Sequence, residues 1–176
     1  FFSWVDERNA ENSSKDIYVQ RVNADGDLLW SDADEGIPLV TAIGEQINNQ
    51  IVLSEVGTAI ISWEDNREND REYSNYAMSI SGDGEMERNW EPEQGKLMVR
   101  NQSAAVIHPD GEGGIYAAWA EGRENPYPNL DIYAQRWDAN GDPVWEEDGI
   151  PICLYDGLRA MPVILRHTLG CAVFYH

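Results

Sequence analysis

The sequence predicts an all-β fold, and three observations lead to this prediction. Short apolar runs alternate along the chain with turn signals rich in Gly, Asp and Asn. No segment combines a helical spacing of apolar residues with the capping residues that begin and end a helix. Four groups of residues recur in one order with a period of roughly 57 residues. Such a repeat indicates one unit of strands that is used several times.

The first recurring group is a tryptophan followed by an acidic residue and then an arginine. It occupies residues 3–9, 62–68 and 118–124. In an extended strand, side chains two positions apart share a face. The three side chains of each group are therefore expected to lie in a row on one face of a strand.

The other three groups follow the first at near-constant offsets. They are a tyrosine block (16–21, 74–79 and 131–136), a second tryptophan series (Trp30, Trp90 and Trp145), and a glycine-led strand (36–40, 95–99 and 149–153). We therefore treat residues 1–176 as one segment of tandem repeat units. The units cover about 1–50, 51–103 and 104–159, and residues 160–176 start a further unit.

The third repeat unit shows its expected strands in order. Residues 104–108 form a short apolar strand, and residues 110–114 form a Gly-rich turn. Residues 115–121, rich in aromatic and small apolar side chains, form the second strand. Residues 131–137 alternate between two faces and form the third.

A hairpin turn and an edge complete this repeat unit. Asn140–Gly141 is expected to adopt a type I′ turn, because both residues tolerate the left-handed backbone angles that this turn requires. Residues 143–145 and 150–153 then form the outer edge of the sheet. Each repeat unit is thus interpreted as four antiparallel strands.

A four-stranded antiparallel unit in tandem favours a β-propeller, which typically closes with about 4–8 blades. A solenoid or a string of small sandwiches is the alternative. Three blades leave the ring incomplete, so we expect further blades in a longer chain or a ring completed by another chain. The sequence begins at Phe1 without Met and stops within strand-like residues, so we expect a processed product, a fragment or part of a longer protein.

The most regular part of the repeat resembles a known class of sequences. Residues 118–123, 131–145 and 148–153 resemble tandem repeats of large secreted and cell-surface bacterial proteins, which are similar to sialidase-like β-propellers. The resemblance implies an extracellular propeller that is commonly a non-catalytic segment of a multidomain protein. The Asp box of sialidases has one residue fewer between its Gly and Trp than the turn at 138–145 has.

Composition limits the classes of partner. The 176 residues include 12 Lys and Arg against 32 Asp and Glu, which gives a formal net charge of −20. Nucleic-acid binding requires a basic surface, and anionic membranes attract basic segments, so neither partner is expected. No apolar run is long enough for membrane insertion. An aromatic content of 10% is too high for a disordered chain.

The recurring row of Trp, acid and Arg is the first candidate for chemistry. An acid beside an anion-binding Arg would suit a catalytic site. A catalytic site is needed once, however, whereas this row recurs in every repeat unit, and recurrence favours a structural role. Paired carboxylates such as Glu146–Glu147 or Asp32 and Asp34 are expected by chance in so acidic a chain.

Metal sites and nucleophiles receive little support. The turns 23–27 and 138–142 place oxygen ligands at alternate positions, as calcium loops do, but a hairpin turn explains the same residues. His108, His167 and His176 share no ligand spacing. Cys153 and Cys171 form either a disulfide or two buried thiols. We therefore assign no catalytic, cofactor-binding or metal residue and no cofactor, with calcium as the one alternative.

The leading functional hypothesis is a non-catalytic extracellular or cell-surface module. It acts as a scaffold or binds a protein or glycan, and it associates with its own copies if another chain completes the ring. One alternative is a fragment of a sialidase-like glycoside hydrolase. Another is a filament subunit in which incomplete terminal blades of successive chains pair.

Overall fold

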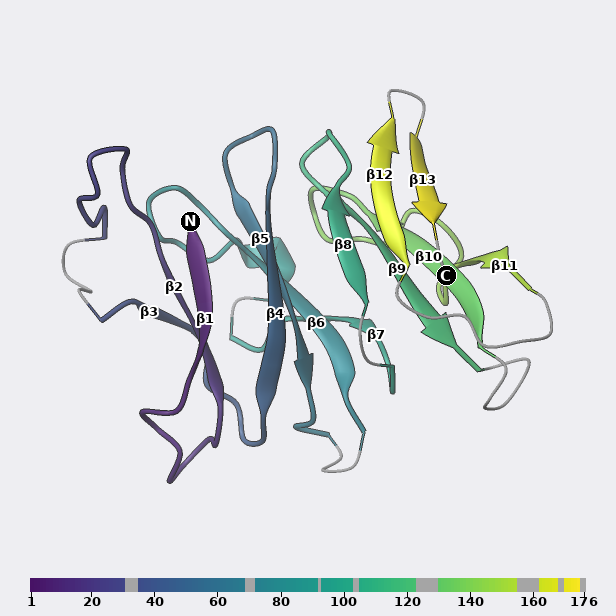
Figure 1. The fold of residues 1–176 in the computed structure, drawn as a ribbon. Helices are drawn as coiled ribbons and strands as arrows, with labels where there is room; N and C mark the ends of the chain where they lie inside the picture. The colour runs from purple at the N-terminus through teal and green to yellow at the C-terminus, as the bar shows by residue number, and fades with distance from the viewer. Residues whose placement is uncertain are drawn as a thin grey trace. The chain divides into compact units, whose positions relative to one another are not determined.

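The computed structural model describes residues 1–30, 35–68, 72–91, 93–102, 105–122, 130–154, 162–167 and 170–174. It confirms the all-β prediction. In these ranges thirteen strands form four antiparallel sheets, and the one helical element is the short 3-10 turn Arg88–Trp90 (Figure 1). None of the described residues belongs to a helix long and apolar enough to cross a membrane.

The chain divides into two compact units. The first comprises Phe1–Leu53 and Gly57–Asn101, and the second comprises Ser54–Val56 and Gln102–His176. Each holds two sheets among its described residues, so the packing of one sheet on the next is seen once in each compact unit.

The first compact unit contains a three-stranded and a four-stranded sheet. The first sheet has the order β1-β2-β3, with β1 Phe2–Asp6, β2 Asp16–Gln20 and β3 Ile37–Val40. The second sheet has the order β4-β5-β6-β7, with β4 Gln46–Leu53, β5 Ala59–Asp65, β6 Ser74–Ile80 and β7 Lys96–Val99.

The second compact unit contains a four-stranded sheet and a hairpin. The third sheet has the order β11-β10-β9-β8, with β8 Val106–Pro109, β9 Ile115–Glu121, β10 Asp131–Trp137 and β11 Ile150–Cys153. The fourth sheet pairs β12 Val163–His167 with β13 Gly170–Phe174. The strands predicted at 115–121, 131–137 and 150–153 coincide with β9, β10 and β11.

The first sheet differs from the expected repeat unit because it has three strands among the described residues. The strand β4 spans the expected boundary between residues 50 and 51. It pairs with β5, through partners such as Ile51 with Ile61, and therefore belongs to the second sheet. Hydrogen bonding across the β4–β5 hairpin decides this assignment, because the apolar pattern of β4 by itself suits either sheet.

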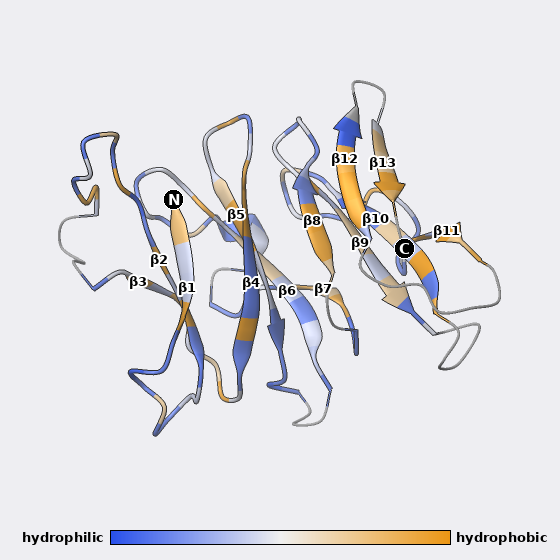
Figure 2. Ribbon diagram, viewed as in Figure 1, coloured by the Kyte–Doolittle hydropathy of each residue, from blue (hydrophilic) through white to orange (hydrophobic). Residues whose placement is uncertain are grey.

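The middle strands form the core. Every residue of β5 and β6 is buried, polar ones included, and so is every residue of β2. Apolar side chains on both faces are what strands covered on both sides require. In Figure 2 apolar residues are most evident along β8 and β12, whereas β4 and β6 are drawn largely in the blue and white of hydrophilic and intermediate residues.

The turn at 140–141 is a hairpin, but it is not of type I′. Only Gly141 has a positive φ (+72°), whereas type I′ requires positive φ at Asn140 as well. The amide of Gly141 donates to the carbonyl of Asp138 (2.9 Å), and the amide of Asp138 donates to the carbonyl of Asp142 (3.0 Å). This pattern is that of a type I turn followed by a left-handed glycine. Pro143 then makes an isolated bridge to Trp137 rather than starting a strand.

Each recurring glycine lies against the ring of a recurring tryptophan. A Cβ atom on Gly36 would overlap the ring of Trp4, and the same holds for Gly95 with Trp63 and for Gly149 with Trp119. All three glycines also have positive φ, between +76° and +85°. The flat ring needs a neighbour without a side chain, and this close approach explains why the two series recur together.

Candidate functional site

The recurring tryptophans each bind the acidic side chain two residues later. The indole Nε1 atoms donate to these carboxylates from Trp4 to Asp6 (3.0 Å), from Trp63 to Asp65 (2.9 Å) and from Trp119 to Glu121 (2.8 Å). The row expected from strand geometry is therefore present three times. In each case the acid caps the polar edge of a packed indole.

The arginine of the row closes over the same carboxylate. Arg8 Nε and Nη2 donate to the two Asp6 oxygens at 2.8 and 2.6 Å, and Arg67 Nη2 pairs with Asp65. Such paired, charged hydrogen bonds are among the stronger ones in proteins. The third arginine, Arg123, lies outside the described residues.

A tyrosine ring lies beneath each of the two row arginines that the structure describes. The Arg8 guanidinium carbon lies 4.2 Å from the ring centre of Tyr18, and that of Arg67 lies 4.4 Å from the ring centre of Tyr76. Burial and the nearby Glu68 carboxylate raise the pKa of Tyr76 to about 12. The phenol therefore stays neutral at physiological pH.

This arrangement is poorly suited to acid–base catalysis. Hydrogen bonds from the Arg8 side chain and amide, and from the Trp4 indole, hold the pKa of Asp6 well below its ordinary value of 3.8. A general acid needs a pKa near the working pH. Asp6 stays ionised instead, and its two oxygens already accept bonds from Trp4 and Arg8.

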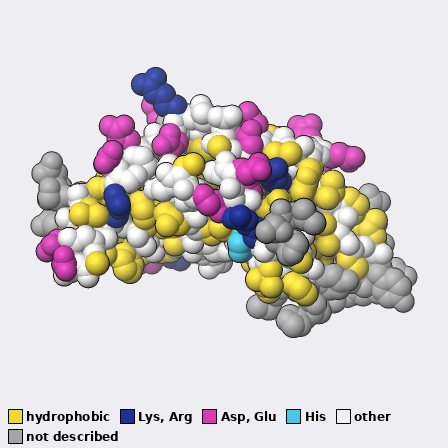
Figure 3. All heavy atoms as spheres, turned by 90° about the horizontal axis from the view of Figure 1, so that it is seen from above, with side chains coloured by type: hydrophobic (Ala, Val, Ile, Leu, Met, Phe, Trp, Pro, Cys, Tyr) yellow, Lys and Arg dark blue, Asp and Glu magenta, His cyan; other side chains and the backbone are white. Residues whose placement is uncertain are grey.

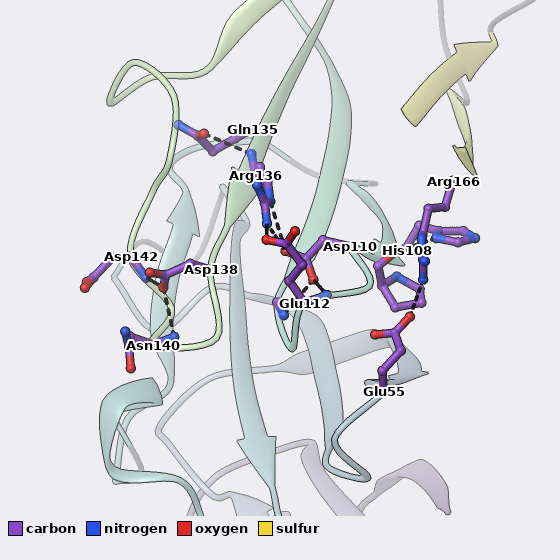
Figure 4. Close-up of polar contacts among 12 residues, drawn as sticks. Glu55, His108, Asp110, Glu112, Gln135, Arg136, Asp138, Asn140, Asp142 and Arg166 are labelled. Carbon is purple, nitrogen blue, oxygen red and sulfur yellow. Dashed lines mark hydrogen bonds and ion pairs between the residues drawn. The ribbon is translucent and has the colours of Figure 1, made fainter. Parts of the chain in front are cut away.

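The proposed calcium turns use their oxygens internally. Asn23 Oδ1 accepts the amides of Asp25 and Asp27, both at 2.9 Å. Asp138 Oδ1 accepts the amides of Asn140 (2.8 Å) and Asp142 (3.0 Å) (Figure 4). Within the described ranges no group of three or more His, Cys, Asp or Glu side chains is placed to hold a metal ion. Calcium binding stays the untested alternative to having no cofactor, and these contacts do not favour it.

A polar cluster not found by sequence reasoning lies at the β8–β9 turn (Figure 4). Arg136 Nε donates to Asp110 Oδ2 (2.9 Å), and its Nη2 donates to Glu112 Oε2 (2.5 Å). Asp110 is inaccessible to solvent, and its Oδ1 accepts the amides of Glu112 and Gly114, both at 2.8 Å. The two acids raise the pKa of Arg136. In the sequence, the one hint of this cluster is the Gln-Arg pair that ends the tyrosine blocks 16–21 and 131–136. Arg136 lies on β10 and Asp110 in the β8–β9 turn, 26 residues away, so the sequence does not show their contact.

A second ion pair lies near this cluster. Arg166 of β12 pairs with Glu55, and Figure 4 places His108 beside them. His108 Nδ1 lies 2.9 Å from the carbonyl oxygen of Pro109. The side chain of His167 and all of His176 lie outside the described residues, as do Asp32 and Asp34. The charges of Arg136 and Arg166 are thus matched by Asp110, Glu112 and Glu55, which suits a structural network.

The two cysteines are free thiols, and both are half-buried. Cys171 packs against a hydrophobic cluster of β9, β10 and β12, and burial raises the pKa of its thiol. Because the thiolate is the reactive form, a raised pKa makes this thiol a poor nucleophile at neutral pH.

The surface around these clusters is acidic. Figure 3 shows Asp and Glu side chains spread over the face drawn, among apolar side chains and a few Lys or Arg. Spread-out acids of this kind favour solubility rather than one binding centre. The chain matches no protein-family model, and comparisons with curated proteins and with solved structures found no match.

Proposed function

We propose that this chain is part of a β-propeller and that it serves as a non-catalytic extracellular or cell-surface module. In this role it acts as a scaffold that carries binding surfaces for a protein or glycan. The four antiparallel sheets and the recurring contacts of the tryptophan rows are compatible with blades. The extracellular setting rests on the resemblance to secreted repeat proteins.

One observation carries the non-catalytic part of the proposal. The acid of every recurring row is bound by its own tryptophan, and in both described arginine contacts it is also bound by its own arginine. A retaining or inverting glycosidase needs two carboxylates that are open to a substrate at defined separation. These acids are committed to neighbouring side chains, so they stabilise the sheets.

The test is an assay with aryl glycosides that release a fluorescent alcohol, including an α-sialoside. We expect no release above the rate in buffer over a full day. An Asp65→Asn variant removes one carboxylate of a recurring row, and it serves as the matched control for any turnover that the wild type shows. Turnover that this variant or a Glu112→Gln variant abolishes would contradict the proposal and favour the glycoside hydrolase alternative.

The location is tested separately. An antibody raised against the chain should label intact cells of the source organism, or its culture medium. Labelling that requires cell permeabilisation would contradict the extracellular assignment while leaving the non-catalytic assignment in place.

A further inference from the structure

In the first compact unit, the first sheet meets the second through one defined face. Ser3 and Val19 are cross-strand partners and share this face. Asn49 of β4 donates to Ser3 Oγ (2.6 Å), and Arg21, two residues after Val19, donates from Nη1 to the carbonyl of Gly82 (2.7 Å). The face with Ser3 and Val19 therefore packs on the following sheet.

In the second compact unit, the third sheet meets the fourth through the matching face. Ala118 and Ala134 are cross-strand partners, and they form a hydrophobic cluster with Ile164 of β12. Ala118 precedes Trp119 just as Ser3 precedes Trp4. In both compact units, then, the face opposite the recurring tryptophan packs on the sheet that comes next in the sequence.

The fourth sheet has an apolar face that no described residue covers. Val163 and Phe174 are cross-strand partners on this face, and Leu165 lies two residues further along β12. Leu165 is 54% exposed and Phe174 is 55% exposed. The opposite face, with Ile164 and Val173, packs on the third sheet. We call the surface of Val163, Leu165 and Phe174 the trailing face.

The strand register shows which face of the third sheet is equivalent to the trailing face. In the third sheet, the first residue of β8, Val106, pairs with Ala118. In the fourth, the first residue of β12, Val163, pairs with Phe174. Phe174 therefore takes the place of Ala118, whose face is buried against a following sheet. The trailing face has the position and apolar character of a surface that packs on another sheet.

The first sheet offers the matching surface. Trp4 is paired with Tyr18, and Phe2 lies on the same face two residues earlier. This face is opposite the one that contacts the second sheet. Phe2 is 59% exposed and Trp4 is only half-buried, whereas the equivalent Trp63 is 1% exposed. We call the surface of Phe2 and Trp4, beside which Tyr18 is buried under Arg8, the leading face.

We propose that the trailing face of one copy of this chain packs on the leading face of a second copy. The inference rests on the proposed function, because it treats the sheets as equivalent blades. The chain carries both the trailing and the leading face. In each compact unit, moreover, the face opposite the recurring tryptophan packs on the sheet that comes next in the sequence. Such a head-to-tail contact joins different surfaces, so it either closes into a ring or continues into a filament.

Net charge sets the conditions for this association. Each copy carries a formal charge of −20, so copies repel one another at low salt. At about 0.15 M salt, charges are screened beyond roughly 8 Å, while burial of apolar surface is not weakened. Association should therefore increase as salt is raised, which is opposite to the behaviour of a contact held by ion pairs.

The test uses sedimentation velocity on the 176-residue chain from micromolar to millimolar concentration, at low and at about 0.5 M salt. We expect wild-type species at multiples of 19.9 kDa. Phe2→Asp blocks the leading face and Leu165→Asp blocks the trailing face, so each variant by itself should be monomeric. An equimolar mixture of the two has one intact pair of faces, so it should form a dimer and nothing larger.

Controls separate this contact from non-specific association and from unfolding. Ile43→Asp changes an apolar side chain that is 80% exposed in the β3–β4 connection, and it should associate like the wild type. Near-ultraviolet circular dichroism checks the fold of each variant, and Val163→Asp replaces Leu165→Asp if the latter unfolds. Val163 lies on the same face.

Three results would overturn the proposal: a wild-type chain that is monomeric throughout, a mixture that forms no dimer, or an Ile43→Asp variant that is equally impaired. If the chain is monomeric and still lacks glycosidase activity, only this inference fails. If it associates as expected but hydrolyses glycosides, only the non-catalytic function fails.

Discussion

Trp4 and Trp63 make the same local contacts, but the two rings differ in how far they are buried. Both donate to an aspartate two residues later, and their ring centres lie 6.1 and 6.2 Å from those of Tyr18 and Tyr76. Yet Trp63 is 1% exposed, whereas Trp4 is only half-buried. The side chains of the neighbouring aspartates show the same difference, at 0% exposure for Asp65 and 12% for Asp6.

The comparison separates two causes. The contacts within each row come from residues close in sequence and from the adjacent strand, so they form wherever the motif folds into a sheet. Burial of the row depends instead on whether a neighbouring sheet covers it. The same motif should consequently contribute different amounts of stability at its two positions, because apolar burial adds to the local contacts.

The largest effect is expected from truncating the two rings. Trp63→Ala should lower the free energy of unfolding by about 3–5 kcal/mol, because it leaves a cavity in a fully buried site. Trp4→Ala should cost roughly half as much, because water already reaches part of the ring. Urea unfolding monitored by far-ultraviolet circular dichroism measures both. Equal losses of unfolding free energy would show that the local contacts of the motif, and not its burial by a neighbouring sheet, set its contribution to stability.

An intermediate effect is expected at the glycines beneath the rings. Gly95→Ala should cost about 2–4 kcal/mol, since the new methyl group meets the Trp63 ring and the backbone has a φ of +76°. Gly36→Ala should cost less, because the half-buried Trp4 ring is freer to move.

Gly57→Ala is the control that isolates the ring contact. Gly57 has a similar φ of +86°, but a Cβ atom there would meet nothing within 4 Å. Its cost should be about 1–2 kcal/mol, from the backbone alone. If Gly95→Ala and Gly57→Ala are equally destabilising in urea unfolding, the close approach of ring and glycine is unimportant.

The smallest effect concerns acid stability at the first row. The pKa of Asp6 is lowered in the folded chain, so its ionised form stabilises the fold above about pH 4, and this stability is lost as pH falls through the folded pKa. Asp6→Asn should remove about 1 kcal/mol or less at neutral pH, because the pair is partly solvated.

The difference between wild type and Asp6→Asn should therefore shrink from pH 5 to pH 2 in urea midpoints. Asp25→Asn, at an exposed turn position, should run parallel to the wild type. A constant difference across this pH range for Asp6→Asn would mean that its charge does not contribute to stability.

Sequence reasoning was most successful for strands of the third repeat unit. The alternation of 131–137 and the apolar run of 115–121 depend on a local period of two, which a single sequence displays. It failed on the 140–141 turn, because the Asp138 side chain binds two amides of that turn. Asp and Asn side chains compete with backbone bonding in this way, and the Asn-Gly pair by itself does not reveal it.

Contacts between strands were mostly missed. The series of tryptophans and the series of glycines were both identified, but nothing in a linear pattern shows that Gly95 lies against Trp63. The pair of Arg136 and Asp110 was missed for the same reason, since 26 residues separate its members. The strand order that joins β4 to β5 likewise follows from hydrogen-bond pairing rather than from composition.

The sequence by itself determined the all-β class, three strands of the third repeat unit and the local row of Trp, acid and Arg. These follow from alternation of side chains along a strand, which acts over a few residues. Only the tertiary structure decided which rows are fully buried, which glycines meet the rings, and which apolar faces no described residue covers. Those properties depend on which sheet packs on which face, and this packing joins residues that are distant along the chain.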